Sequence, residues 1–249
     1  MPETLTHQET VTVSIVSHGQ WEMIAPLLDQ LNRWCVDSIA KIVLTSNLAE
    51  SINVRPHWKF PIERIENPQP RGFGANHNTA FRRCETEWFL ILNPDIRLES
   101  DVVGTLLRCA RKTDGVLAPR IREPGKSEPE PYRSTLTPFE LISKRLRRHH
   151  PPPVPAWVAG MFMQTNSRMY RHVGGFDERY YMYCEDFDFC ARIQLAGAHV
   201  RVIETQEVLH DARRASHINI RHLYWHISSL TKLWLSATFW KFICRKRRL

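Results

Sequence analysis

Two stretches of the sequence place polar side chains immediately after apolar runs, where a strand would end. In the first, Asn93, Pro94 and Asp95 follow the run Trp88 to Leu92. Because proline cannot continue a hydrogen-bonded ladder, the chain must turn there and Asp95 must project from the strand end. A carboxylate placed so can hold Mg²⁺ or Mn²⁺ against a diphosphate. A turn that binds no ligand explains the tetrapeptide Leu92 to Asp95 equally well.

The second stretch runs from Gly174 to Asp188 and contains five carboxylates. Its last part, beginning with Glu185 and Asp186, predicts a helix whose positive N-terminal end favours acids. We interpret Asp188 as one half of an ordinary i,i+4 ion pair with Arg192. Asp186 is the candidate for chemistry, because a carboxylate fixed at a pocket mouth can take a proton from an attacking hydroxyl.

The elements that would position these residues alternate between short apolar runs and segments of helical periodicity. Strands are predicted over Val11 to Val16, Ile39 to Leu44, Ile62 to Ile65 and Trp88 to Leu92. Helices are predicted from Trp21 to Leu31, from Asn78 to Cys84, and from Val102 to Ala110 with Ser100 as N-cap. A further strand is expected near Val116 to Ala118. This is a nucleotide-binding type of α/β layout, in which ligands bind at the carboxyl ends of the strands.

Length and charge narrow the class of protein. The 249 residues, 43% hydrophobic with 10 Gly, are those of one globular domain with an appended element, which excludes a disordered or collagen-like chain. A net charge of +8 favours anionic partners such as nucleotides, phospholipids or nucleic acid. No nucleic-acid-binding module is visible, so we expect no nucleic-acid partner. The six cysteines lack a paired CxxC spacing, and the N-terminus lacks the pattern of a secretory signal, so we expect reduced thiols in a cytoplasmic protein.

Two segments differ in character from the rest. Residues 123–155 are rich in proline, glycine and charge, which predicts a mobile loop or lid. Residues 212–249 form a basic, aromatic-rich segment with helical periodicity. That segment either lies on an anionic membrane surface or packs on its own domain, and the sequence favours the two equally. We expect no spanning helix over Leu223 to Ile243, because such a helix would bury charged side chains.

Several of these stretches, taken in order, resemble the inverting family 2 glycosyltransferases, most closely the rhamnosyltransferase-like branch of bacterial surface polysaccharide synthesis. The resemblance is carried by Ser14 to Val16, Asn67 to Asn78, Leu92 to Asp95, Gly174 to Glu178 and Glu185 to Asp188. It covers about residues 11 to 211. It implies the GT-A fold, a nucleotide-binding sheet flanked by helices and fused to an acceptor-binding half, over residues 1–211, followed by the helical segment 212–249.

The resemblance also implies site residues. Asp186 matches the family's general base and Glu185 its acidic neighbour, while Asp95 and His210 match metal ligands for Mg²⁺ or Mn²⁺. The expected donor-binding residues are Ser17, His18, Ser46, Asn47, Gly72, Phe73, Gly74, Asn78, Asn93 and Asp95, with Gly72 to Asn78 as a loop that lines the donor site. The expected acceptor-binding residues are Trp157, Gly160, Asp177 and Tyr181.

The chain departs from the family pattern at two positions. Ser46-Asn47 stands where relatives have Asp-Asn for the nucleobase, and Asn93 stands in place of the first acid of the metal motif. The expected reaction moves a sugar, L-rhamnose from dTDP-L-rhamnose, to a glycan or polyprenyl-diphosphate-linked acceptor at the inner face of the cytoplasmic membrane. A UDP-sugar donor and a catalytically inactive binding protein are the alternatives. A glycosidase would not need the nucleotide-type half.

Overall fold

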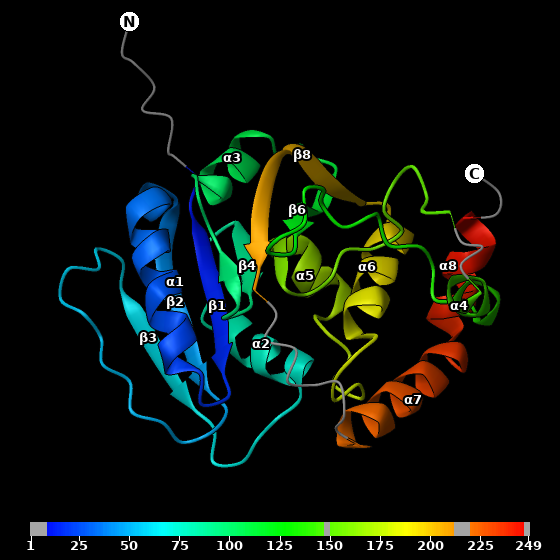
Figure 1. Cartoon of the computed structure of the whole chain (residues 1–249), viewed down its shortest axis with the longest axis horizontal. Helices are drawn as coiled ribbons and strands as arrows, with labels where there is room; N and C mark the ends of the chain where they lie inside the picture. The colour runs from blue at the N-terminus through cyan, green and yellow to red at the C-terminus, as the bar shows by residue number, and fades with distance from the viewer. Residues whose placement is uncertain (1–8, 147–149, 212–219, 247–249) are drawn as a thin grey trace, which may run out of the picture.

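The computed structural model describes residues 9–146, 150–211 and 220–246, and it contains one eight-stranded mixed sheet covered by helices on both faces (Figure 1). The strand order is β3-β2-β1-β4-β7-β6-β8-β5. The strands are β1 (Val11–Ser17), β2 (Ile39–Ser46), β3 (Ile62–Glu66), β4 (Trp88–Leu92), β5 (Ile96–Arg97), β6 (Asp114–Arg122), β7 (Phe162–Asn166) and β8 (His199–His210). The parallel layout expected for the first four strands is confirmed.

The central strands are near-continuous apolar runs because both of their faces are covered. Every residue of β1 and of β4 is buried, which is typical of parallel strands between two helical layers. Ile15 of β1 lies between Leu44 of β2 and Leu92 of β4. The antiparallel strand β7 pairs with β4 and with β6, and so joins the nucleotide-type half of the sheet to the rest.

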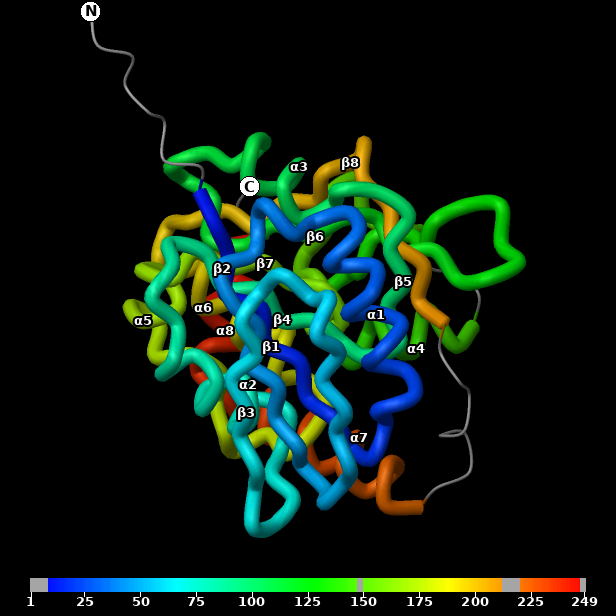
Figure 2. Tube along the Cα trace, turned by 90° about the vertical axis from the view of Figure 1, so that its left-hand side faces the viewer, coloured from blue at the N-terminus to red at the C-terminus, as the bar shows by residue number. Residues whose placement is uncertain are grey.

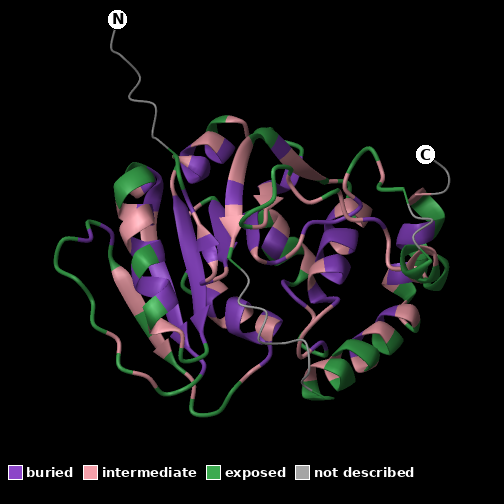
Figure 3. Ribbon diagram, viewed as in Figure 1, coloured by how far each residue is buried: buried purple, intermediate pink, exposed green. Residues whose placement is uncertain are grey.

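Two hydrophobic clusters fill the space between the sheet and its helices. On one face lie α1 (Trp21–Trp34), the short 3-10 turn η1 (Val36–Ser38) and α3 (Val102–Arg108). On the other lie α2 (Phe73–Phe81), α5 (Ser167–Val173) and α6 (Glu185–Leu195). The buried residues, purple in Figure 3, concentrate in the sheet and the inner sides of these helices.

The structure differs from the sequence prediction in the N-cap of one helix and in the bounds of another. Asp101, not Ser100, caps α3, since its side chain accepts a hydrogen bond from the Gly104 amide. Helix α2 spans Phe73–Phe81 rather than Asn78 to Cys84, so most of the segment expected to be a donor-site loop is helical. Its glycines and asparagines are poor helix formers, and tertiary contacts override that preference.

The segment 123–155 is more structured than a loop. It contains α4 (Pro138–Arg145), capped by the Thr137 hydroxyl, which accepts from the Glu140 amide at 3.2 Å. Before it, Arg133 pairs with Trp157 in a β-bridge and Ser134 is buried. The expectation of a mobile loop or lid did not include this helix, in which Pro138 stands at the first turn, where proline is favoured. Whether the segment moves stays a prediction.

The C-terminal segment forms two helices, α7 (Ile220–Trp234) and α8 (Ala237–Lys246), and residues 212–219 lie outside the described part. The expected start of the last helical region near His217 therefore cannot be compared. Phe239 and Phe242 of α8 are buried against Phe187 of α6, each with ring centroids 5.7 Å apart. Figure 2 shows α8 behind the sheet, beside α6. Helix α8 is thus part of the main folded body.

No helix in the described ranges is long and apolar enough to cross a membrane. All six cysteines are free thiols, and four of them are buried: Cys35, Cys84, Cys184 and Cys190.

Candidate active site

The carboxyl ends of β1, β2 and β4 meet at one edge of the sheet, as the sequence predicted. Ser17 pairs with Ser46 at the ends of β1 and β2, and the Asn47 amide donates to the Ser17 carbonyl at 2.8 Å. The next strand, β4, ends at Leu92 beside Ile15. Asn93 and Asp95 therefore follow the same edge as Ser17 and Ser46.

Asn47 is the centre of an amide network that holds the chain after β3. Its Oδ1 accepts from Asn67 Nδ2 at 2.7 Å and from the Arg71 amide at 2.8 Å, and its Nδ2 donates to the Arg71 carbonyl at 2.9 Å. Asn67 Nδ2 also donates to Asn76 Oδ1 of α2. Sequence reasoning missed Asn67 and Asn76 as separate site residues. The signal available in the sequence was the series of polar residues between β3 and α2.

The other expected residues of this corner differ in what they offer a ligand. The Ser17 hydroxyl accepts from the Gln20 amide at 3.0 Å, so it already helps to begin α1. The buried Ser46 Oγ has no hydrogen-bond partner among the described residues. His18 is exposed, with its Nδ1 3.3 Å from Asn47 Nδ2. Ser46 and His18 thus keep groups that a bound base could use.

The glycines at the start of α2 are required by packing inside the protein. A Cβ on Gly72 would lie 2.6 Å from the Tyr181 carbonyl oxygen, and one on Gly74 would lie 2.6 Å from Phe176 Cβ. At Gly160 a Cβ would lie 2.7 Å from the ring of Phe73. The described contacts therefore account for all three glycines without a nucleotide. The sequence had assigned Gly72 and Gly74 to close approach of the donor.

Phe73 and His77 form the inner side of α2. The Phe73 ring meets the His77 ring edge to face at 4.5 Å. His77 Nδ1 lies 2.8 Å from the Ser14 hydroxyl, and burial lowers the pKa of this imidazole to about 3. His77 is therefore neutral at physiological pH, and it anchors α2 to the middle of β1.

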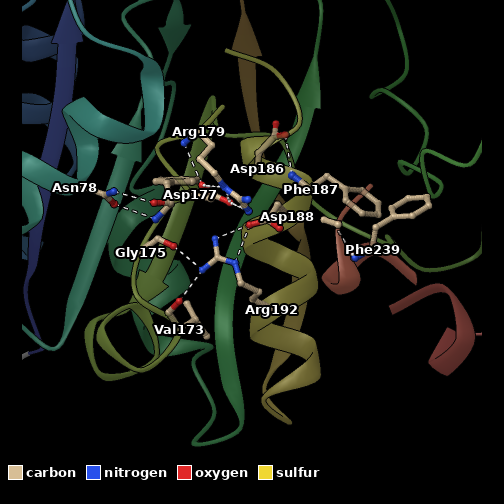
Figure 4. Close-up of polar contacts among 12 residues, drawn as sticks. Asn78, Val173, Gly175, Asp177, Arg179, Asp186, Phe187, Asp188, Arg192 and Phe239 are labelled. Carbon is tan, nitrogen blue, oxygen red and sulfur yellow. Dashed lines mark hydrogen bonds and ion pairs between the residues drawn. The ribbon is translucent and has the colours of Figure 1, made fainter. Parts of the chain in front are cut away.

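Asn78 fastens α2 to the loop between α5 and α6 (Figure 4). Its Nδ2 donates to the Phe176 carbonyl and to Glu178 Oε1, and its Oδ1 accepts from the Phe176 amide and from the Tyr170 hydroxyl. These four bonds use every donor proton and lone pair of the amide. Asn78 thus positions the loop, whereas the sequence had assigned it to the donor.

The carboxylates of the loop and of α6 separate into two groups. Asp188 accepts from Arg192 at 2.7 Å, and Arg192 also donates to the Val173 and Gly175 carbonyls, as Figure 4 shows. This confirms the predicted i,i+4 pair. Asp177 pairs in the same way with Arg179, at 2.6 Å. Neither acid is left with a free charge, although Asp177 had been expected to bind the acceptor.

Asp186 and Glu185 occupy the first turn of α6. Unlike Asp177 and Asp188, they form no ion pair with an arginine within 4 Å among the described residues. Asp186 Oδ2 accepts from the Gly160 amide at 3.3 Å and Oδ1 from the Phe187 amide at 2.8 Å. Burial raises the pKa of the Asp186 carboxyl, and the charge of Arg133 and the backbone donors offset part of that rise. Glu185 is buried, its Oε2 has no partner among the described residues, and burial together with the charge of Asp186 raises its pKa well above the usual range. Such a pair is suited to hold and accept protons.

Asp95 meets His210 because β5 pairs with β8. Ile96 lies opposite His210 in that pairing, and Asp95 Oδ2 is 3.2 Å from His210 Nε2. Burial lowers the pKa of His210, but the hydrogen bond and the charge of Asp95 outweigh it and raise the pKa overall. The residues expected as metal ligands are therefore brought together.

The donor set at this point fits a divalent cation. Asp95 Oδ1 is buried without a hydrogen-bond partner among the described residues, and an imidazole nitrogen lies beside the same carboxylate. A carboxylate and an imidazole suit Mn²⁺ and leave other positions for phosphate and water. Across the described ranges no group of three or more His, Cys, Asp or Glu side chains could hold a metal, so the protein would supply two side chains here.

The two candidate reactive positions are linked by a short path through the residues just before β7. The Asn93 amide donates to the Met161 carbonyl at 2.9 Å, and the neighbouring Gly160 amide donates to Asp186. Residues 160 and 161 therefore contact both the chain that leads to Asp95 and the Asp186 carboxylate. The half-buried Asn93 contributes through its backbone to this arrangement.

Arg133 is a charged residue of the site that the sequence did not single out. Its guanidinium lies over the Trp157 ring at 5.1 Å and donates to Glu130 at 3.0 Å. The charge of Arg133 lowers the pKa values of both Asp186 and His210, so Arg133 acts electrostatically on both residues. The signal was hidden because Arg133 lies in the segment interpreted as a loop.

The remaining expected acceptor residues lie at the same side. Trp157 is buried and its indole donates to the Ser134 carbonyl at 2.7 Å. The Tyr181 carbonyl accepts from the Phe73 amide at 2.9 Å, and its ring packs on Trp225 of α7 at 4.7 Å. Trp157 also packs edge to face on Phe187, the residue after Asp186. The contact of Trp157 and Tyr181 with an acceptor stays a prediction.

Comparison with known sequences matches this chain to glycosyltransferases. The model of glycosyl transferase family 2 matches residues 12–172. Rhamnosyltransferase WbbL of Escherichia coli is 28% identical, with 96% of this chain and 94% of that protein covered. N-acetylglucosaminyl-diphospho-decaprenol L-rhamnosyltransferase of Mycobacterium tuberculosis is 30% identical over 55% of this chain. The chain spans about half the length of that relative, 52%.

Solved structures show the same fold at low sequence identity. GalNAc-T7 with UDP, GalNAc and Mn²⁺ superposes with a TM-score of 0.69 at 15% identity, over 96% of this chain and 48% of that one. A mannosyltransferase from Pyrobaculum calidifontis in complex with GDP-Man and Mn²⁺ gives 0.59 at 16% identity, over 85% and 60%. The fold is therefore GT-A, as the resemblance implied. With a family model that matches most of its length, the chain belongs to glycosyltransferase family 2.

Proposed function

We propose that this glycosyltransferase moves L-rhamnose from dTDP-L-rhamnose to a hydroxyl of a polyprenyl-diphosphate-linked glycan, with inversion at the anomeric carbon. One observation carries the proposal: Asp95, which pairs with His210, follows Asn93, whose amide donates to the Met161 carbonyl, and the neighbouring Gly160 amide donates to the half-buried carboxylate of Asp186. Two relatives, named for rhamnosyl transfer, support the choice of sugar, and the mycobacterial one supports the acceptor.

In this proposal Asp186 is the general base. The acceptor oxygen forms a bond to the anomeric carbon while the bond from that carbon to the diphosphate breaks, and the hydroxyl proton passes to Asp186. The Gly160 and Phe187 amides fix the carboxylate, and its raised pKa makes it a stronger base than an exposed aspartate. A single displacement of this kind gives the opposite anomeric configuration.

Asp95 and His210 are the residues that would hold Mg²⁺ or Mn²⁺. When bound, the cation supplies charge neutralisation for the leaving diphosphate. The orphaned Asp95 Oδ1 supports this assignment, because a buried carboxylate oxygen without a partner costs free energy unless something binds it. Arg133, whose charge acts on His210, adds a positive charge from the protein.

The base of the nucleotide would meet the corner formed by Ser46, Asn47 and His18. Asn47 is fully engaged with Asn67 and Arg71, so it shapes the corner. The free Ser46 hydroxyl can donate to or accept from a base edge, and His18 can lie against a base face. The neutral Ser46 hydroxyl does not act on the nucleobase as a charged aspartate would. The donor panel below therefore includes UDP-sugars.

The direct test is nucleotide release from a panel of dTDP-L-rhamnose and UDP-sugars, with Mn²⁺, Mg²⁺ or EDTA, in the presence of a lipid-linked acceptor. We expect release from dTDP-L-rhamnose that stops with EDTA and returns with the cation. Asp95→Asn should lose the response to added metal. Release from a UDP-sugar alone would replace the donor in the proposal, and donor binding without release in any condition would favour an inactive binding protein.

A further inference from the structure

Helix α7 contacts the chain that leads into the two acids of α6. The Ser229 hydroxyl of α7 donates to the Met182 carbonyl at 2.8 Å. The Trp225 ring packs on the Tyr181 ring, with centroids 4.7 Å apart. Figure 1 shows α7, in orange, beside the yellow chain that leads into α6. One side of α7 therefore packs on the loop that ends where α6 begins.

Tyr183 receives two further contacts from α7. Its hydroxyl lies 2.7 Å from His222 Nδ1, and its ring packs on the His226 ring with centroids 4.7 Å apart. Burial, and after it the charge of Glu185, raise the pKa of the Tyr183 phenol, so the hydroxyl keeps its proton and can donate to His222. Since His222 and His226 are four residues apart, they lie on one side of the helix. Helix α7 thus holds Tyr183 by a hydrogen bond and by a ring contact.

The backbone between these contacts and the acids has an uncommon conformation. Tyr183 and Cys184 have φ angles of 71° and 67°, both in the left-handed region. Residues other than glycine rarely adopt this region, because it costs free energy, and they keep it only where surrounding contacts hold them there. The contacts of α7 with Met182 and Tyr183 lie directly at this turn.

Helix α6 has no side-chain cap among the described residues. Its N-cap is Cys184, whose thiol makes no capping hydrogen bond, whereas helices usually begin at a residue whose side chain can cap them. The Asp188 amide donates to the Cys184 carbonyl at 2.9 Å, so the first turn begins directly at Cys184. The position of Asp186 in that turn therefore depends on the position of Cys184, and through it on Tyr183.

We propose that α7 positions the base, and that His222 and Ser229 are its positioning residues. Their contacts hold the two residues before Cys184, and the first turn of α6 then holds the Asp186 carboxyl against the Gly160 amide. The match with the family model ends at residue 172, so α7 lies outside the part of the chain that this model describes. The inference rests on the proposed function, because a base needs a fixed position relative to the reacting sugar.

The test uses the full chain with single substitutions in α7. His222→Ala removes the partner of the Tyr183 hydroxyl. Ser229→Ala removes the hydrogen bond to the Met182 carbonyl. The matched control is Thr231→Ala, since Thr231 is an exposed residue of α7 whose hydroxyl donates within the helix, at 2.9 Å. Because alanine is the best helix former, none of these changes should unfold α7.

The first readout is hydrogen exchange of backbone amides, which needs neither donor nor acceptor. His222→Ala and Ser229→Ala should each raise the exchange rate of the Asp188 amide by about tenfold or more, because the turn before it opens more often. The Leu90 amide in β4 should exchange as in the original protein, and Thr231→Ala should change neither rate. Unchanged exchange at Asp188, or an equal rise at Leu90, would overturn the proposal.

The second readout is the change in kcat compared with the change in donor KM, at a temperature where circular dichroism shows every variant folded. A displaced base should lower kcat in His222→Ala by about tenfold or more and leave the donor KM within about twofold. His222→Asn keeps a polar group near the position of Nδ1 and should restore most of the rate. Tyr183→Phe combined with His222→Ala should be no slower than the slower single variant, because both changes remove one contact.

The two readouts separate this inference from the proposed function. If the original protein transfers sugar and His222→Ala has the kcat of Thr231→Ala, the positioning role is wrong and the proposed function stands. If the original protein transfers no sugar from any donor, the proposed function fails. The exchange measurement then still decides whether α7 holds the first turn of α6.

Discussion

Asp186 and Asp188 lie two positions apart on α6, but their surroundings give them different tasks. Asp188 is bound to Arg192, which also ties down the loop through the Val173 and Gly175 carbonyls. Among the described residues, Asp186 accepts hydrogen bonds from the backbone amides of Gly160 and Phe187 and from no side chain. A paired acid holds structure, whereas an unpaired and partly desolvated one can accept a proton.

The first prediction concerns these two acids. Asp186→Asn should lower the rate of sugar transfer by about 10² to 10⁴, because the amide cannot take the hydroxyl proton, and should leave donor binding intact. The rate and the donor affinity are measured on the same samples. Asp188→Asn is the control: it should lower the melting temperature while the folded fraction stays active. Equal loss of transfer in both variants at equal stability would contradict the assignment.

A second prediction concerns the pH dependence of the same base. Asp186 must be ionised to act, so the rate should fall as pH falls through its raised pKa. The positive charge of Arg133 favours the ionised form, so Arg133→Gln should raise that pKa and move the acidic limb of the rate profile to higher pH. Arg133→Lys keeps the charge and should leave the limb where it is. An unchanged limb in Arg133→Gln would show that Arg133 does not act on Asp186.

At the scale of elements, α2 and the loop after α5 depend on one side chain. Asn78 makes four hydrogen bonds to Tyr170, Phe176 and Glu178. Asn78→Ala should cost about 2–4 kcal/mol in the free energy of unfolding, because it leaves donors and acceptors of partly buried groups without partners. Urea unfolding measures this cost.

The matched control is Asn32→Ala, since Asn32 makes one exposed hydrogen bond, from the Lys59 amide at 2.8 Å. That variant should lose about 1 kcal/mol or less. If Asn78→Ala were no more costly than this control, the amide would not fasten the two elements together as described.

The sequence predicted the first four strands well and some helices poorly, for physical reasons. The run Trp88 to Leu92 is a buried strand with the predicted bounds, because an apolar run between polar residues leaves few alternatives. Helix α2 was placed five residues late because Gly72, Gly74 and Asn76 are weak helix formers. Helix α4 was hidden among prolines and charges.

The sequence predicted which residues belong to the site better than it predicted how these residues contact one another. The resemblance named both Asp95 and His210, but their meeting depends on the pairing of β5 with β8, far apart in sequence. The close packing at Gly72, Gly74 and Gly160 could not be predicted, since each glycine contacts a neighbour from another segment. Periodicity and composition carry no information about such long-range contacts.

At the scale of the whole molecule, one sheet joins the nucleotide-type corner to the half that carries Asp186. Strand β7 lies antiparallel between β4 and β6, and residues 160 and 161 just before it contact both Asp186 and Asn93. Helix α8 closes the far side by burying Phe239 and Phe242 against α6. The base is thus held between the sheet and the C-terminal helices, and α7 reaches from there to the surface.

The most direct test of the central claim is the product of the complete reaction. The full chain is incubated with dTDP-L-rhamnose, Mn²⁺ and a polyprenyl-diphosphate-linked N-acetylglucosamine acceptor in anionic vesicles, and the product is analysed by mass spectrometry and NMR. The account predicts one rhamnose added per nucleotide diphosphate released, with an anomeric configuration opposite to that of the donor. A retained configuration, or no sugar on the acceptor although the donor binds, would contradict it.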